Sequence, residues 1–120
     1  LQPGDHGSTY SGTALATAAV NAVISEMKRL NAPELAVRQG DRLSKGLSSI
    51  SKIDHVRGSG LLLGAQLKDG IVAGDVYKDL LEAGLIVNAV NATTLRFAPP
   101  LTVSDAEIDE AVAMVKEVLK

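Results

Sequence analysis

Two short candidate strands, the stretches at residues 53–60 and 61–67, constrain the fold of this chain most. In the second stretch apolar side chains occupy both faces, which is typical of a strand inside a sheet. Alternation in the first stretch places Ile53, His55 and Arg57 on one face. Glycines within and between the stretches favour a bend or a close approach of two backbones. The sequence therefore predicts a sheet with at least one internal strand.

Helical periodicity predicts the elements around these strands. Apolar residues recur three and four positions apart over residues 13–30, 33–50 and 72–83, and each run predicts a helix with one apolar face. We expect Gly40 and Gly46 to weaken the second helix, because glycine costs up to about 1 kcal/mol relative to alanine inside a helix. Gly84 is placed to end the third helix.

The remaining elements are a hairpin and a last helix. Residues 85–90 and 93–98 predict two strands joined by a turn at 91–92, and two prolines follow. Ser104 and Glu107 fit a capping box at the start of the final helix. The order of elements predicts an α+β fold, with a small, mostly antiparallel sheet of about four strands and helices on one face.

Composition excludes several classes of function. The net charge of the 120 residues is -2 and the basic residues are scattered, which argues against nucleic acid. The chain has no cysteine, and His6 and His55 lie too far apart in sequence to suggest a metal site. No apolar run approaches the roughly 20 residues that span a bilayer, and the start does not resemble a signal peptide. We therefore expect a cytoplasmic location, with no metal, nucleic acid or membrane as partner.

A glycine-rich loop at residues 4–12 leads into the first predicted helix. Free backbone N–H groups at a helix start, with the hydroxyls of Ser8 and Thr9 beside them, could hold a phosphate. An ordinary loop with a helix cap explains the same residues. Both readings stay open from spacing alone.

Arg96 is the second candidate, since it lies in an otherwise apolar strand just before two prolines. Its guanidinium matches a carboxylate or a phosphate, whereas the simpler reading is an edge-strand arginine paired with a surface acid. Arg57 has the same profile with a weaker case. No catalytic triad can be assembled, because the loop hydroxyls have no evident base apart from His6. His55 is more typical of a half-exposed strand residue than of a base.

Three stretches carry a family resemblance: residues 3–12 (PGDHGSTYSG), 57–64 (RGSGLLLG) and 95–101 (LRFAPPL). In order and content they resemble the carboxy-terminal portion of the class-III, ornithine-type pyridoxal-phosphate aminotransferases, nearest to the acetylornithine branch. The resemblance covers essentially the whole chain. It implies the small domain of such an enzyme, with residues 1–12 as cofactor-phosphate loop and connection and residues 13–120 as one α+β domain.

The resemblance also implies roles for three residues. Ser8 and Thr9 would bind the phosphate of pyridoxal phosphate held by the neighbouring subunit of a homodimer, and Arg96 would bind the α-carboxylate of an amino-acid substrate. The parent reaction would convert N-acetylornithine and 2-oxoglutarate to the semialdehyde and glutamate, in arginine biosynthesis. The family's Gly-Gly-Asn-Pro after the loop is here residues 11–14 (SGTA), so the local turn and the helix start can differ.

The resemblance implies that the Schiff-base lysine and the other cofactor-binding groups belong to a large domain without counterpart in these residues. We therefore expect a piece of a larger enzyme that holds no catalytic residue, does not retain pyridoxal phosphate and is inactive by itself, with an empty, mobile loop. The large domain, the second subunit and the substrate are the expected partners. Two alternatives remain: another ornithine-type aminotransferase, acting on ornithine or succinylornithine, and a free-standing α+β module that binds a small anion.

Overall fold

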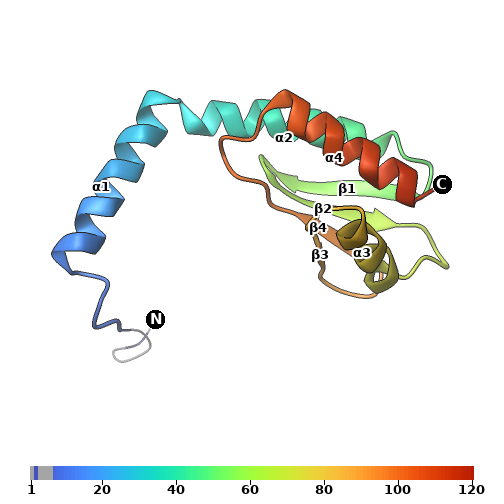
Figure 1. Ribbon diagram of the computed structural model, residues 1–120, viewed down its shortest axis with the longest axis horizontal. Coiled ribbons are helices and arrows are strands. Elements are labelled where there is room, and N and C mark those ends of the chain that lie inside the picture. The colour runs from blue at the N-terminus through green and yellow to red at the C-terminus, as the bar shows by residue number, and fades with distance from the viewer. Residues whose placement is uncertain (1, 3–6) are drawn as a thin grey trace. The chain divides into compact units, whose positions relative to one another are not determined.

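The computed structural model describes residue 2 and residues 7–120, as two compact units that divide after Ala32. The first unit contains helix α1 (Ala14–Arg29), which begins where the Thr13 hydroxyl accepts a hydrogen bond from the Ala16 N–H, at 3.4 Å (Figure 1). The apolar face predicted for this helix exists, but none of its residues is buried. The boundary predicted after residue 12 stays a prediction.

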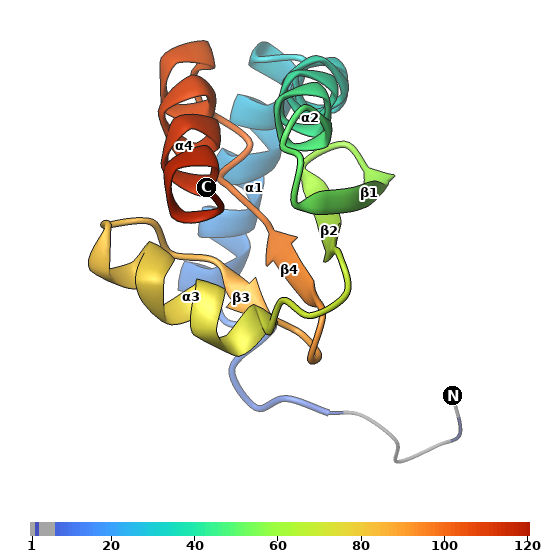
Figure 2. The ribbon, with the colours of Figure 1, turned by 90° about the vertical axis from the view of Figure 1, so that its right-hand side faces the viewer.

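The second unit holds the sheet and three helices. The elements are α2 (Ala32–Ser48), β1 (Ile53–Ser59), β2 (Leu62–Leu67), α3 (Ala73–Glu82), β3 (Asn88–Ala89), β4 (Thr94–Phe97) and α4 (Asp105–Val118). The sheet has the order β1-β2-β4-β3, and all three strand pairs are antiparallel (Figure 2). The predicted α+β fold, with four strands, is confirmed.

The core lies between one face of the sheet and helices α2, α3 and α4. Each of these three helices and each of the two central strands contributes buried apolar side chains, and these form one cluster: Leu43, Leu47, Leu63, Ala65, Val76, Leu80, Leu95, Phe97, Ile108 and Val115. Side chains alternate along a strand. The other residues of β2 and β4 therefore lie on the opposite face of the sheet, which we call the open face.

A bulge at Asp54 corrects one prediction. Ile53 pairs with Leu67 and His55 with Gln66, so β1 uses one residue more than its partner strand. An extra residue reverses the alternation. Ile53 is therefore buried in the core, whereas His55 and Arg57 lie on the open face; the prediction that all three share a face is wrong.

Strand β3 is shorter than the predicted 85–90 because the hydrogen-bonded cap that follows helix α3 extends to Leu85. Gly84 has a φ of +95°, and its N–H donates to the Leu81 carbonyl while the Leu85 N–H donates to that of Leu80. These two bonds form a Schellman motif, so Gly84 ends the helix as predicted. Leu85 is thereby held on the helix, and ladder pairing begins only at Asn88.

Candidate functional site

Arg96 lies on the open face in a row of residues that crosses the whole sheet. Arg57 pairs with Gly64, Gly64 with Arg96, and Arg96 with Asn88, one residue from each strand. Directly paired residues share a face of the sheet. Two arginines therefore flank a glycine on the face that no helix of this unit covers.

The partner of Arg96 is an amide rather than an acid. Its Nη2 donates to the Asn88 Oδ1 at 2.5 Å, and no ion pair among the described residues includes it. Strand β4 lies between β2 and β3. The simpler interpretation of Arg96, an edge-strand arginine paired with a surface acid, is therefore wrong.

A polar network on the open face holds Arg57. Its Nη1 lies 3.3 Å from the His55 Nε2 and 3.5 Å from the Gln66 Oε1, and its Nη2 lies 3.5 Å from the Thr94 Oγ1. Thr94 is only 1% exposed and donates to the Gln66 Oε1 at 2.9 Å. The last two contacts of Arg57 are at the long limit of a hydrogen bond, so they orient the guanidinium without saturating it.

His55 connects this network to a carboxylate. Its Nδ1 lies 2.7 Å from the Asp54 Oδ2. Because arginine can only donate, the Nε2 of His55 accepts from Arg57, and the Nδ1–H then donates to Asp54. His55 is thus a bridge between Asp54 and Arg57, on an exposed strand, and the prediction that it is an ordinary half-exposed residue agrees with this place.

The two arginines line one surface hollow of about 390 Å³. Gly58, Leu62, Leu63, Gly64, Val90 and Thr94 complete its lining. The sequence predicted Arg96 as a site residue and gave Arg57 a weaker case. The contribution of Asn88 was missed, because only the pairing of β3 with β4 brings its amide to the arginine.

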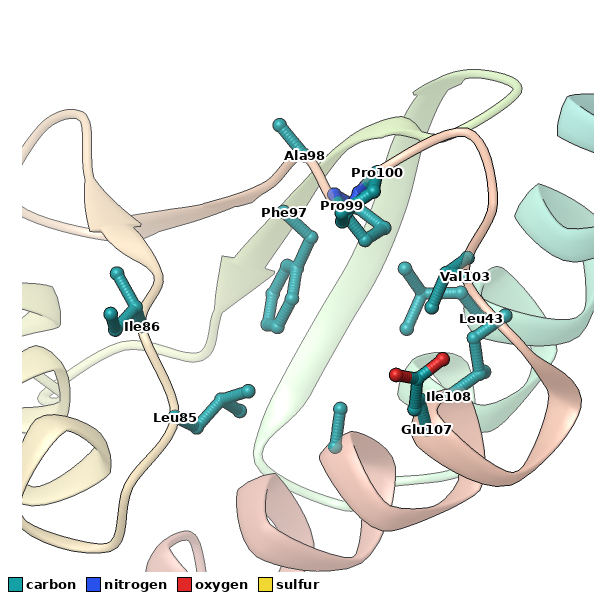
Figure 3. Close-up of a pocket in the computed structure, with 11 residues that line it drawn as sticks. Leu43, Leu85, Ile86, Phe97, Ala98, Pro99, Pro100, Val103, Glu107 and Ile108 are labelled. Carbon is teal, nitrogen blue, oxygen red and sulfur yellow. The ribbon is translucent and has the colours of Figure 1, made fainter. Parts of the chain in front are cut away.

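A second cavity, of about 330 Å³, lies on the core side of β4. Figure 3 shows Phe97 and Leu85 pointing into it, and its lining is apolar apart from Glu107. That carboxylate is already engaged, because it accepts hydrogen bonds from the Ser104 N–H at 2.8 Å and from the Ser104 hydroxyl at 2.7 Å. These bonds hold the pKa of Glu107 below its ordinary value. The predicted capping box is confirmed, and this cavity offers no free charged group.

The acidic side chains at the start of α4 also stabilise the packing of the helices. Arg42 on α2 binds Asp109 through its Nε, at 2.8 Å, and through its Nη2, at 2.6 Å, and it contacts Asp105 at 3.2 Å. The bond to Arg42 lowers the pKa of Asp109. The buried Gln39 donates to the Val103 carbonyl and to Asp105, both at 2.9 Å. This network joins α2 to α4, which lie side by side in both views.

Ser8 and Thr9 belong to the first unit. Both are exposed, and neither hydroxyl makes a hydrogen bond among the described residues, although the Ser8 carbonyl accepts one from Ser11 at 3.3 Å. Open space surrounds Gly7, where an added Cβ would meet no atom within 4 Å. Residues 3–6 of the loop, His6 included, lie outside the described residues. Two free hydroxyls beside an open glycine fit the oxygens of a phosphate group.

Within residues 2 and 7–120 no histidine, aspartate or glutamate cluster could hold a metal ion. None of the helices described is long and apolar enough to cross a membrane.

Comparison with known proteins gives a consistent result. The family model described as "Aminotransferase class-III" matches residues 1–119. The acetylornithine aminotransferase of Caldanaerobacter subterraneus subsp. tengcongensis is 38% identical over 99% of this chain and 31% of its own length. Ornithine aminotransferase 1 of Staphylococcus saprophyticus is 35% identical over 100% of this chain and 30% of its own length.

A solved structure agrees with these sequences. The ornithine aminotransferase of Toxoplasma gondii superposes with a TM-score of 0.82 at 30% identity, over 99% of this chain and 30% of its own. Partial occupancy of PLP is described for the active site of that structure. This chain thus spans about a third of the length of the relatives that it matches.

Proposed function

The chain belongs to the class-III aminotransferases, a family that uses pyridoxal phosphate, and on that premise we propose that it forms the substrate-carboxylate and cofactor-phosphate half of an aminotransferase site. Relatives of both the acetylornithine and the ornithine type match it. Our specific proposal is an acetylornithine aminotransferase that acts on N-acetylornithine and 2-oxoglutarate, in arginine biosynthesis. Ornithine and succinylornithine are the alternative substrates.

The guanidinium of Arg96, which has no carboxylate partner among the described residues, is the observation that carries the proposal. It stands on an internal strand, on the open face, with one amide partner and no carboxylate. A guanidinium fork binds a carboxylate through two parallel hydrogen bonds. We assign to Arg96 the binding of the substrate's α-carboxylate, which fixes the position of the amino group.

Ser8 and Thr9 are proposed to bind the phosphate of the cofactor. Their free, exposed hydroxyls beside Gly7 suit phosphate oxygens. When bound, pyridoxal phosphate supplies the electron sink that transamination needs. In this chain the two residues only hold the phosphate. We propose that this phosphate is bound together with a large domain and a second subunit of a homodimer.

A chimeric enzyme tests the proposal. In it, this chain replaces the matching 31% of the Caldanaerobacter enzyme. We expect the chimera to bind pyridoxal phosphate and to form glutamate from N-acetylornithine and 2-oxoglutarate. Arg96→Lys should lower kcat/KM for N-acetylornithine roughly 10- to 150-fold, because charged hydrogen bonds of about 1.5–3 kcal/mol are lost. Cofactor absorbance checks that the variant is assembled.

The controls separate substrate binding from general damage. Arg38→Lys changes an exposed arginine of α2 in the same way and should leave kcat/KM unaltered. If the chimera acts on ornithine or succinylornithine and not on N-acetylornithine, the proposed substrate is wrong and the active compound takes its place. The 120-residue chain alone, supplied with pyridoxal phosphate, should form no glutamate. An Arg96→Lys chimera as active as its parent would contradict the role of Arg96.

A further inference from the structure

We propose that Arg57 and Arg96 act as a pair, binding the two carboxylates of a small dicarboxylate above Gly64 on the open face of the sheet. The inference deepens the proposed function and rests on it for the role of Arg96. It adds Arg57 as a residue that contacts the substrate and determines its class.

The strand register sets the spacing of the pair. Arg57 and Arg96 each pair directly with Gly64, from opposite sides. Paired Cα atoms lie about 5 Å apart, so the two arginines are roughly 10 Å apart at their Cα atoms. Both side chains line the same hollow of about 390 Å³. A ligand with an anionic group at each end can therefore meet both guanidinium groups without a change in the backbone.

Both arginines retain unused donors that face no competing acid. Of the five N–H groups of Arg57, three make the contacts with His55, Gln66 and Thr94, which leaves the Nε–H and one Nη2–H without a partner among the described residues. Arg96 uses one N–H, on Asn88, and keeps four by the same count. Each guanidinium can thus still form hydrogen bonds with a carboxylate.

The charge of the hollow favours a dianion. Neither arginine takes part in an ion pair of the described residues. Asp54, the carboxylate linked to the network, reaches Arg57 only through His55. Two positive charges on one hollow attract a ligand with two negative charges more strongly than a ligand with one.

Gly64 keeps the floor of the hollow open although packing does not require glycine there. An added Cβ would lie 3.5 Å from the Thr94 Cγ2 and 3.8 Å from the Arg57 Cγ, which are ordinary contacts. Its φ is not among the positive values of this chain. A larger side chain at this position would stand between the two guanidinium groups and occupy the space that the ligand needs. Space, rather than backbone geometry, therefore explains a glycine here.

Titration of the 120-residue chain with glutarate and with butyrate tests the pair. The readout is the NMR signal of each arginine Nε–Hε group, assigned by substitution, and the backbone amide spectrum reports folding. We expect glutarate to shift the signals of Arg57 and Arg96 together, with an affinity at least about tenfold above that of butyrate, because one set of charged hydrogen bonds is missing for the monoacid. Equal affinities for the two acids would overturn the inference.

Three variants make the test specific. Arg57→Gln should lower the affinity for glutarate about tenfold or more and leave that for butyrate nearly unchanged. Gly64→Val retains both charges and suits a strand, yet should lower the glutarate affinity by filling the hollow. Arg38→Gln removes an equal charge on helix α2 and should change neither affinity. An unchanged glutarate affinity in Arg57→Gln, or an equal loss in Arg38→Gln, would contradict the pair.

The two proposals fail in different ways. If Arg57→Gln binds glutarate normally while Arg96→Lys abolishes the activity of the chimera, the pair is wrong and the proposed function stands. If the pair binds glutarate as expected while Arg96→Lys leaves the chimera active, the aminotransferase role of Arg96 is wrong. The site would then belong to a binding module for small dicarboxylates.

Discussion

At Gly40 the backbone of helix α2 passes so close to the turn between β1 and β2 that no side chain fits. An added Cβ would lie 2.1 Å from the Gly60 carbonyl oxygen and 2.9 Å from the Gly60 Cα. At Gly46, on the same helix, a Cβ would come within 2.6 Å of the Val112 Cγ2 on α4. The two glycines let α2 approach the sheet and α4 closely.

Gly40→Ala should destabilise the fold. Alanine gains up to about 1 kcal/mol in a helix, but a clash with backbone atoms costs typically about 1–3 kcal/mol and occasionally more. We expect a lower free energy of unfolding in urea, measured by circular dichroism. Gly74→Ala in α3 is the matched control, since open space surrounds Gly74, and it should stabilise by about 0.4–1 kcal/mol. A Gly40→Ala protein as stable as Gly74→Ala would contradict the close contact.

At the scale of single residues, the sequence identifies which residues are unusual but does not predict which residues contact them. Gly40 and Gly46 were expected to weaken α2 on helix propensity alone, while their role in packing depends on atoms 20 or more residues away. Arg96 was identified because a lone charge in an apolar strand is visible in the sequence. Its position opposite Arg57, with Gly64 between them, needs the register of three strands, which alternation alone does not provide.

Helix α4 shows how charge fixes the start of an element. Ser104 and Glu107 hydrogen-bond to each other at the N-terminus, and Asp109 binds Arg42 of α2. Both carboxylates have a pKa below the ordinary value in the folded chain, Glu107 through its bonds to Ser104 and Asp109 through its bond to Arg42. A lowered folded-state pKa means that the stabilisation is complete above the unfolded-state pKa and is lost as the pH falls through the folded-state value.

The Glu107→Gln substitution tests how much the negative charge at this helix start contributes to stability, because it leaves the size of the side chain almost unchanged. Glutamine retains a capping-box side chain but does not titrate in this range. We expect the wild-type chain to have the higher Tm at pH 6, and this advantage to shrink as the pH falls below 4.5, the ordinary pKa of a glutamate. The measurement is the thermal unfolding of both proteins from pH 6 to pH 3.

The control for that experiment lies in the same helix. Glu110→Gln removes a charge from an exposed residue of α4 whose side chain makes no hydrogen bond or ion pair among the described residues. At pH 6 the Tm of Glu110→Gln should differ less from the wild-type Tm than the Tm of Glu107→Gln does. Equal Tm values of wild type and Glu107→Gln at pH 6 would contradict the lowered pKa of Glu107.

Elements with a local signature were predicted well, and elements set by distant contacts less so. The capping box of α4 and the glycine end of α3 are read from a few adjacent residues, and both are confirmed. The bulge at Asp54 and the late start of β3 have no comparable local signal. The first depends on the pairing with β2, and the second on the hydrogen bonds that the Gly84 and Leu85 N–H groups donate to the preceding helix.

At the scale of the molecule, helix α1 differs from every other helix. It has no buried residue, and its apolar side chains Leu15, Val20, Val23 and Ile24 are exposed. An isolated helix of about 15 residues is marginally stable in water, since most helical stability in proteins comes from packing. The sequence predicted its amphipathic pattern correctly, but periodicity does not say what covers the apolar face.

Hydrogen exchange should therefore divide the 120-residue chain in two. We expect the amides of α1 to exchange at nearly the rate of an unfolded peptide, while those of β2 and β4 are strongly protected by the core. Mass spectrometry of peptic fragments measures both in one sample, so β2 serves as the internal control. If the amides of α1 are protected as strongly as those of β2 in a dilute sample, the expected division of the chain is contradicted. Protection that grows with protein concentration would indicate self-association through the apolar face.

The row of Arg57, Gly64 and Arg96 has a consequence for how such a chain can change over generations. On β2 and β4 the residues of the row alternate with core residues, so that Gly64 stands between Leu63 and Ala65, and Arg96 between Leu95 and Phe97. Under our proposal for this face, substitutions in the row alter what it binds without repacking the core behind it. Ligand preference can therefore drift, or be redesigned, one strand position at a time, while selection for a stable scaffold acts on the intervening residues.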